Sequence, residues 1–420
     1  MELFYSISVL LIIATLFSYI NSRFLKLPST IGIMVIAMIF SVVLVILGRI
    51  TPKPLEDVYS LINHVDFTQL LMGGMLYFLL FAGAIQINIK DLREQKLAII
   101  VFSTLSVIIS TFVVGFVLYY ALGFLLPLLG IQTPVSLLYC LLFGALISPT
   151  DPIAVLSILK EAKVSKSLET KVSGESLFND GVAVIAFTLI YNLIQGTENP
   201  EDITFITISG LLIKEIIGAL LVGFILGHIG FYAMKTTDDY KLSVLVTISI
   251  VIGGYMISQA MGISGPLTMV SAGILIGNAG RRYSEKKHIE NNFLKTFWEL
   301  TDEILNAILF LLIGFELLMI PNPHDYWIVG LLSIAVVLFA RYVSIKIPTL
   351  VIPFREKYSK GTIIILVWGG LRGGVSIALA LSIADAEFRN VIVTVTYFVV
   401  VFSIVIQGLS IGKIARKIKC

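Results

Sequence analysis

Long apolar stretches recur along the whole chain and constrain its fold more than any other feature. A helix needs about 20 consecutive apolar residues to cross the hydrocarbon core of a bilayer, and about 13 stretches of this chain qualify. They fall at 3–22, 28–48, 66–87, 97–126, 134–159, 172–194, 203–233, 242–260, 265–280, 294–319, 327–347, 361–381 and 391–412. The sequence therefore predicts an all-α polytopic membrane protein that forms a single unit over residues 1–420.

The composition argues against the main soluble classes. Only 14% of the residues are charged and 57% are apolar, whereas an average soluble protein has about 25% charged residues. The mean hydropathy is +0.97. A net charge of +3 is too small for a nucleic-acid partner. Cys140 and Cys420 are too few for a disulfide framework or a zinc site.

The positions of Lys and Arg predict the orientation, because cytoplasmic loops collect these residues. With the N-terminus outside, 24 of the 30 Lys and Arg fall in loops or a tail on the inside. Only Arg49, Lys53 and Arg389 fall outside. We therefore expect a multi-pass protein of the cell membrane with a cytoplasmic C-terminus and no soluble domain.

Two spans are interrupted at matching places in the two halves of the chain. Pro149 and Pro152 break the span at 134–159, and glycines on both sides of Arg372 break the span at 361–381. Paired broken helices are typical of inverted-repeat transporters and indicate a binding site near the middle of the bilayer.

Five ionisable residues within spans carry most of the functional signal. They are Asp151, Glu175, Asp180, Arg341 and Arg372. Each costs about 2.5–3.5 kcal/mol at the bilayer centre and marks an ion pathway by default. If all five share one region, the three acids exceed the two arginines by one negative charge. One proton or one monovalent cation would neutralise that charge, which is the property of a one-for-one cation/proton exchanger.

Helical geometry separates the acids of the span at 172–194. Ser176 and Asp180 are four residues apart and share a face, whereas Glu175 lies about 140° around the helix from Asp180. A carboxylate and a hydroxyl on one face are hard oxygen ligands for a cation. Glu175 is better placed to meet an arginine from another helix.

The break at 148–152 supplies further oxygen atoms. Pro149 and Pro152 lack amide hydrogens, so nearby carbonyl groups lose their helical partners. We expect these carbonyls, the Thr150 hydroxyl and the Asp151 carboxylate to be available as cation ligands. Asn179 both donates and accepts hydrogen bonds, and we expect it to brace the break and not to bind the ion.

The remaining polar groups are less informative. Glu299, Asp302 and Glu303 open the span at 294–319, where acids either complement a helix N-terminus or attract cations to an inner funnel. His64, His228, His288 and His324 lack metal-ligand spacing. No P-loop signature occurs, so we expect no nucleotide, no cofactor and transport driven by ion gradients.

Three motifs together resemble the sodium/proton antiporters of the NhaP/NHE group. They are Ser148-Pro149-Thr150-Asp151-Pro152, Gly174-Glu175-Ser176-Leu177-Phe178-Asn179-Asp180-Gly181 and Gly369-Gly370-Leu371-Arg372-Gly373-Gly374. The resemblance implies an NhaA-like inverted-repeat fold with 13 helices, a dimerisation domain, and a six-helix core with two crossing broken helices. In that core, 97–194 and 327–412 would form the two halves, and the other spans would form the scaffold of a homodimer.

The resemblance also implies roles for individual residues. Asp180 matches the ion- and proton-binding aspartate, and Asp151, Ser176 and the Thr150 carbonyl match the other ligands of a Na⁺ site. Glu175 and Arg372 match a structural ion pair, with Arg341 nearby. The pair Asn179-Asp180 is similar to that of the electroneutral branch, which exchanges one Na⁺ or Li⁺ for one proton.

Three other functions stay open at this point. A K⁺/H⁺ antiporter of the same fold is one of them, because hard oxygen ligands alone do not determine which monovalent cation binds. A cation channel fits less well, because the chain lacks a carbonyl selectivity-filter segment. An intramembrane aspartyl protease also needs two buried aspartates, but Asp151 and Asp180 are not flanked as in such a protease. We expect no enzymatic activity.

Overall fold

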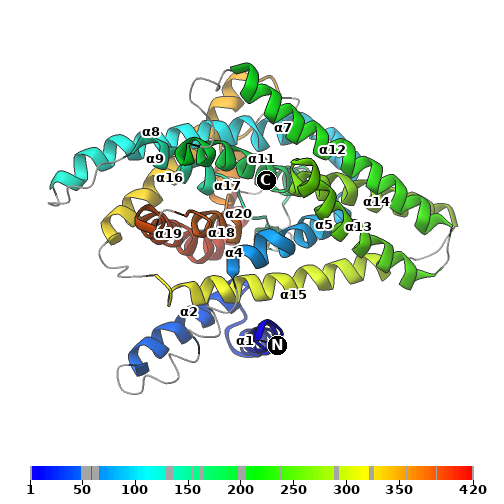
Figure 1. Cartoon of the computed structure of the whole chain (residues 1–420), viewed down its shortest axis with the longest axis horizontal. Helices are drawn as coiled ribbons and strands as arrows, with labels where there is room; N and C mark the ends of the chain where they lie inside the picture. The colour runs from blue at the N-terminus through cyan, green and yellow to red at the C-terminus, as the bar shows by residue number, and fades with distance from the viewer. Residues whose placement is uncertain are drawn as a thin grey trace.

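The computed structural model describes most of the chain. The described residues are 2–48, 58, 66–128, 136–152, 155–156, 158–159, 162, 164–196, 205–236, 239–287, 293–320, 326–354, 358–384 and 386–418. Over these residues every regular element is a helix, which confirms the all-α class (Figure 1).

The helices of the described residues follow one another along the chain. In chain order they are α1 (Glu2–Ile20), η1 (Asn21–Leu25), α2 (Ser29–Gly48), α4 (Phe67–Leu70), η2 (Leu71–Met75), α5 (Leu76–Gln86), α6 (Ile89–Glu94), α7 (Lys96–Ser103), α8 (Leu105–Leu128), α9 (Leu137–Ile147), α11 (Lys166–Gln195), α12 (Phe205–Lys235), α13 (Tyr240–Met261), α14 (Gly265–Lys287), α15 (Phe293–Glu316), α16 (Trp327–Val351), α17 (Lys360–Trp368), α18 (Gly374–Leu381), α19 (Ala386–Val401), η5 (Phe402–Gln407) and α20 (Gly408–Ile418).

Nine segments of the described chain are long and apolar enough to cross a membrane. They are Tyr5–Leu25, Ser29–Gly48, Phe67–Gln86, Lys96–Leu125, Lys166–Gln195, Gly210–Lys235, Tyr240–Met261, Trp327–Val351 and Phe388–Ile418. Each coincides with an expected span. The other four expected spans contain α14, α15 and the two broken helices. The chain is thus a multi-pass membrane protein, and the full number of about 13 crossings stays a prediction.

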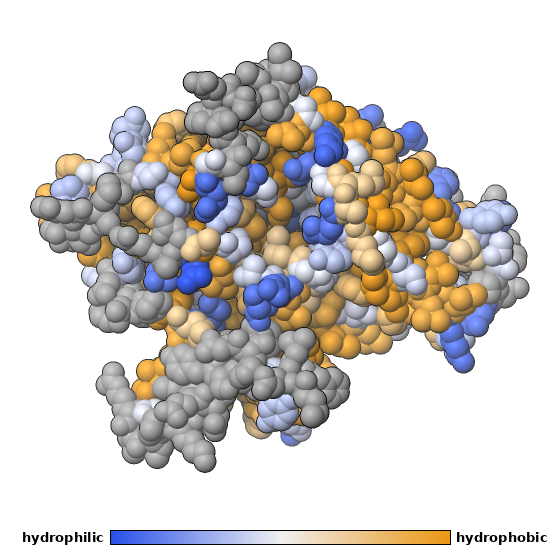
Figure 2. All heavy atoms as spheres, in the orientation of Figure 1, coloured by the Kyte–Doolittle hydropathy of each residue, from blue (hydrophilic) through white to orange (hydrophobic). Residues whose placement is uncertain are grey.

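Many apolar side chains lie on the face of the protein drawn in Figure 2, and others form its interior. On α12, Ile213, Leu221 and Ile229 are each more than half exposed. The interior, in contrast, contains charged side chains, among them Glu175 and Arg372. This inverted distribution fits a protein whose outer surface faces lipid tails and whose ionisable groups face one another.

The two broken helices cross at their interruptions. α9 ends at Ile147, and the chain runs without helix through Ser148–Pro152. α17 ends at Trp368, and α18 begins at Gly374. The Asp151 amide donates a hydrogen bond of 2.7 Å to the Leu371 carbonyl. The two non-helical segments therefore touch, as the NhaA-like fold requires.

Helix α11 joins the two apolar cores of the molecule. Val172 and Phe187 belong to the larger core, and Leu177 belongs to a smaller core with α5 and α14. Two glycines permit this close packing. A Cβ on Gly174 would lie 2.6 Å from Ile99 Cδ1, and one on Gly181 would lie 2.6 Å from Leu267 Cγ. The middle of α11 is thereby held at the centre of the molecule.

Candidate functional site

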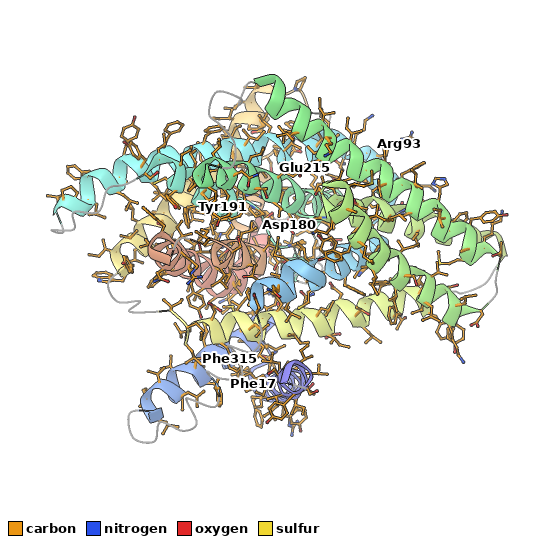
Figure 3. All side chains as sticks on the ribbon, viewed as in Figure 1. Phe17, Arg93, Asp180, Tyr191, Glu215 and Phe315 are labelled. Carbon is orange, nitrogen blue, oxygen red and sulfur yellow. The ribbon has the colours of Figure 1, made fainter. Side chains whose placement is uncertain are left out.

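A cavity of about 660 Å³ leads from the surface to the middle of α11. At its mouth lie Lys166 and Lys295, whose side chains are 74% and 63% exposed. At its inner end lie Asp151 and Asp180. Asp180 is only 8% exposed, and Figure 3 places it near the centre of the molecule. The cavity therefore connects solvent at one surface to the half-buried Asp151 and the buried Asp180.

Oxygen atoms from α11 and from the first broken helix meet at the inner end of this cavity. Thr150 Oγ1 and Ser176 Oγ lie 2.9 Å apart and share a hydrogen bond. Ser176 and Asp180 both line the cavity, so the shared face expected from their spacing is confirmed. Thr150 and Asp151 line it from the other side. The four proposed ligand residues are thus brought together.

Asn179 braces the break, but through a side chain. Its Nδ2 donates to Thr150 Oγ1, a side-chain hydroxyl of the break, at 2.8 Å. Asn179 is fully buried, and its Oδ1 has no hydrogen-bond partner within the described part of the chain. Asn179 therefore holds the Thr150 hydroxyl in place for Ser176.

Arg372 satisfies the carbonyl groups that the prolines leave unpaired. Its Nη1 donates to the carbonyls of Ser148 and Pro149, at 2.6 and 2.9 Å. The backbone amide of Arg372 donates to Ser403 Oγ at 2.9 Å. The expectation that these freed carbonyls would be cation ligands is therefore wrong for Ser148 and Pro149. The Arg372 guanidinium reaches these two carbonyls because the second break lies against the first.

Glu175 forms its ion pair with Arg341 of α16, between Glu175 Oε1 and Arg341 Nη1. The helix-face prediction that Glu175 meets an arginine is confirmed, but the pairing with Arg372 implied by the resemblance is corrected. Arg341 Nη2 also donates to the Leu366 carbonyl at 3.0 Å. Gly370 permits this approach, since a Cβ there would lie 2.7 Å from Arg341 Nε.

Three acids and two arginines lie at or beside the inner end of the cavity. The Glu175–Arg341 pair is neutral by itself. Arg372 lies beside the break that carries Asp151, where it donates to two backbone carbonyls. Carboxylate and hydroxyl oxygens are the ligand types suited to a hard cation. By formal count the three acids exceed the two arginines by one negative charge.

Comparison with known proteins decides the family. The family model described as "Sodium/hydrogen exchanger, transmembrane" matches residues 11–417. The chain belongs to the sodium/hydrogen exchanger family. It is 43% identical to the Na⁺/H⁺ antiporter NhaP of Pseudomonas aeruginosa, over 98% of this chain and 96% of the relative. It is 32% identical to the Na⁺/H⁺ antiporter NhaH of Halobacillus aidingensis, over 98% of this chain and 97% of that relative.

A solved structure supports the fold. The chain resembles the sodium proton antiporter MjNhaP1 of Methanocaldococcus jannaschii with a TM-score of 0.77, at 20% identity and with 100% of both chains covered. Members of the sodium/hydrogen exchanger family are transporters and not enzymes, so the alternative of an aspartyl protease is set aside.

The cavity also contains a residue that the sequence did not single out, Ser376 of α18. Nothing in its local sequence marks it, although it follows the second break. Gly373, a glycine of that break, also lines the cavity, and a Cβ there would lie 2.6 Å from Asp151 Oδ2. Asp302 and Glu299 line the cavity as well, whereas Glu303 is exposed and does not. Of the histidines named above, only His228 lies within the described residues, and it is exposed.

Proposed function

We propose that this protein exchanges one Na⁺ or Li⁺ for one proton across the cell membrane by alternating access. Two curated relatives with matching length bear the name Na⁺/H⁺ antiporter. The proposed ligands are the Asp180 and Asp151 carboxylates, the Ser176 hydroxyl and the Thr150 carbonyl. Asn179, Glu175, Arg341 and Arg372 would hold the ligands in position.

The observation that carries the proposal is that the site is reached from one side. The cavity ends at Asp180. Beyond it, α11 continues with Val182, Ala183, Ile185 and Phe187, all of them buried. A buried charge that is open to one surface and sealed by apolar packing on the other suits a carrier better than a channel. A channel requires a continuous path with several weak sites.

The open side supports an inward-facing state. Lys166 and Lys295 at the mouth lie in the first turns of α11 and α15, at helix ends that the distribution of positive charge puts on the inside. We therefore assign an outside N-terminus and a cytoplasmic C-terminus. We further propose a homodimer in the lipid bilayer, with 97–194 and 327–412 as the two halves of the transporting core.

One net negative charge explains both competition and stoichiometry. Na⁺ and H⁺ neutralise the same group, so each excludes the other. The loaded site then has the same charge in both half-cycles, and no net charge crosses the membrane. Raising the proton concentration should raise the apparent KM for Na⁺ and leave the maximal rate nearly constant.

The test is proton movement in proteoliposomes that contain the purified protein. Na⁺, Li⁺ and K⁺ are added in turn at constant ionic strength, and an ionophore clamps the membrane potential at several values. We expect Na⁺ and Li⁺ to move protons at a rate that does not depend on voltage. Movement with K⁺ alone would assign a K⁺/H⁺ antiporter. A rate that rises steeply with voltage would contradict the one-for-one exchange.

A further inference from the structure

A third carboxylate lies in the same cavity, on helix α15. Lys295, Glu299, Asp302 and Leu309 line the cavity at spacings that place them on one stripe of the helix. Near the mouth, Lys295 and Glu299 neutralise each other across 3.5 Å. Asp302 lies one turn deeper, and no Lys or Arg of the described chain forms an ion pair with it. Its charge is additional to the charges that define the inner site.

The acids that act on Asp302 electrostatically are Asp151, Glu303 and Glu299. Asp151 and Asp302 line the same cavity and are close enough for their charges to interact. Two carboxylates in a partly enclosed space repel each other unless a cation lies between them. The cavity thus favours a cation between Asp151 and Asp302, in addition to one beside Asp180.

A second, independent observation comes from helix α18, which packs against α15. Ser376 of α18 is 1% exposed and lines the cavity, yet its Oγ has no hydrogen-bond partner among the residues described. It lies one helical turn after Gly373, which packs against the Asp151 carboxylate. A buried hydroxyl without a partner is uncommon in a folded protein and calls for an explanation. A bound cation, or a water in its hydration shell, would supply the missing partner.

Asn306 lies on α15 beside the Asp302 carboxyl. It continues the stripe between Asp302 and Leu309 and is 2% exposed. Its amide is within hydrogen-bonding reach of the Asp302 carboxyl. Asn306 is therefore placed to hold the Asp302 carboxylate in one orientation.

We propose a second cation position in the cavity, formed by Asp302, Ser376 and the cavity side of Asp151. It accepts a partly hydrated monovalent cation from the mouth and passes it to Asp180, with Asp151 shared by both positions. Asn306 orients the Asp302 carboxylate. This inference rests on the proposed exchange of Na⁺ for H⁺ at Asp180, and it adds the step by which Na⁺ reaches that residue.

The first arm of the test measures transport. Asp302→Asn should raise the apparent KM for Na⁺ about tenfold, as expected for the loss of a nearby carboxylate in a partly hydrated cavity. Ser376→Ala should raise the apparent KM less. Asp302→Glu keeps the carboxylate, so its apparent KM should stay near that of the wild type. Glu303→Gln is the matched control, because it removes the same charge from an adjacent exposed residue. Equal effects of Asp302→Asn and Glu303→Gln would overturn the proposal in favour of a general surface charge.

The second arm measures equilibrium binding of radiolabelled Na⁺ to purified protein, with choline keeping the ionic strength constant. Asp180→Asn removes the inner site, so the remaining binding reports the second position. We expect weak saturable binding in this variant and its loss when Asp302→Asn is added. Absence of binding in Asp180→Asn would overturn the inference while exchange by the wild type stays intact. If the wild type moves no protons with Na⁺, the proposed function fails, and this arm still decides whether the second position exists.

Discussion

The pairing of Glu175 with Arg341 can be tested through its contribution to the free energy of unfolding. The two side chains are 2% and 6% exposed, so neither charge is hydrated in the folded protein. Removing one partner of such a pair leaves an uncompensated buried charge, which costs about 3–5 kcal/mol of the free energy of unfolding. Glu175→Gln and Arg341→Met should each cause a loss of this size.

The double variant distinguishes a specific pair from two independent losses. With Glu175→Gln and Arg341→Met combined, no unpaired charge remains, so the combined loss should fall short of the sum by about 3 kcal/mol. The same cycle between Glu175 and Arg372 should give a coupling below about 1 kcal/mol. Arg372 contributes instead through the Ser148 and Pro149 carbonyls, which Arg372→Gln would leave unpaired.

The assay is equilibrium unfolding of the purified protein in mixed micelles, followed by tryptophan fluorescence at constant lipid and detergent composition. All variants are compared at one pH and one Na⁺ concentration, because ligand binding also stabilises the folded state. A larger coupling of Glu175 with Arg372 than with Arg341 would refute the assignment of the ion pair. Loss of Na⁺ binding by a stably folded Glu175→Gln variant would instead make Glu175 a ligand.

Two further predictions concern the site, and a third concerns a hydrogen bond outside it. Asp180→Asn should abolish Na⁺-dependent proton flux in proteoliposomes and leave a monodisperse membrane protein, because Asn neither titrates nor supplies the charge; near-normal flux would refute the role of Asp180. Gly373→Ala should raise the apparent KM for Na⁺ several-fold, because the new Cβ would displace the Asp151 carboxylate. Gly83→Ala is the control: its Cβ would meet its nearest atom at 3.6 Å, so it should leave the KM unchanged. Tyr191→Phe removes the hydroxyl that accepts the Ala384 amide at 2.8 Å, and this should cost about 0.5–1.5 kcal/mol of unfolding free energy; a stability equal to that of the wild type would show that the bond contributes nothing.

Much of the fold could be predicted from the sequence because it depends on local properties. Apolar runs of membrane length predicted the spans, and nine of them are directly matched. Prolines and glycines predicted where the helices at 134–159 and 361–381 break, because missing amides and missing side chains act within a few residues. The spacing within α11 likewise predicted that Ser176 and Asp180 share a face and that Glu175 points toward an arginine.

The partners of the buried charges could not be predicted in this way. Glu175 and Arg341 are 166 residues apart in the chain, and Arg372 was an equally plausible partner for Glu175. Likewise, the chain alone did not indicate that the Ser148 and Pro149 carbonyls would be taken by Arg372. Charges in a medium of low permittivity must pair, but which ones pair depends on distances between helices.

Sequence alone thus determined that this chain is a helical membrane protein with ionisable groups at two breaks, since hydropathy, helical period and backbone chemistry are properties of neighbouring residues. Only the tertiary structure decided that the breaks cross and that Arg372 donates hydrogen bonds to the free carbonyls of one of them. It also decided that a cavity from one surface reaches Asp180. It also placed Ser376 and Asp302 on the walls of that cavity. Cavities and charge pairs arise from the packing of segments distant in the chain, and no local pattern encodes their geometry.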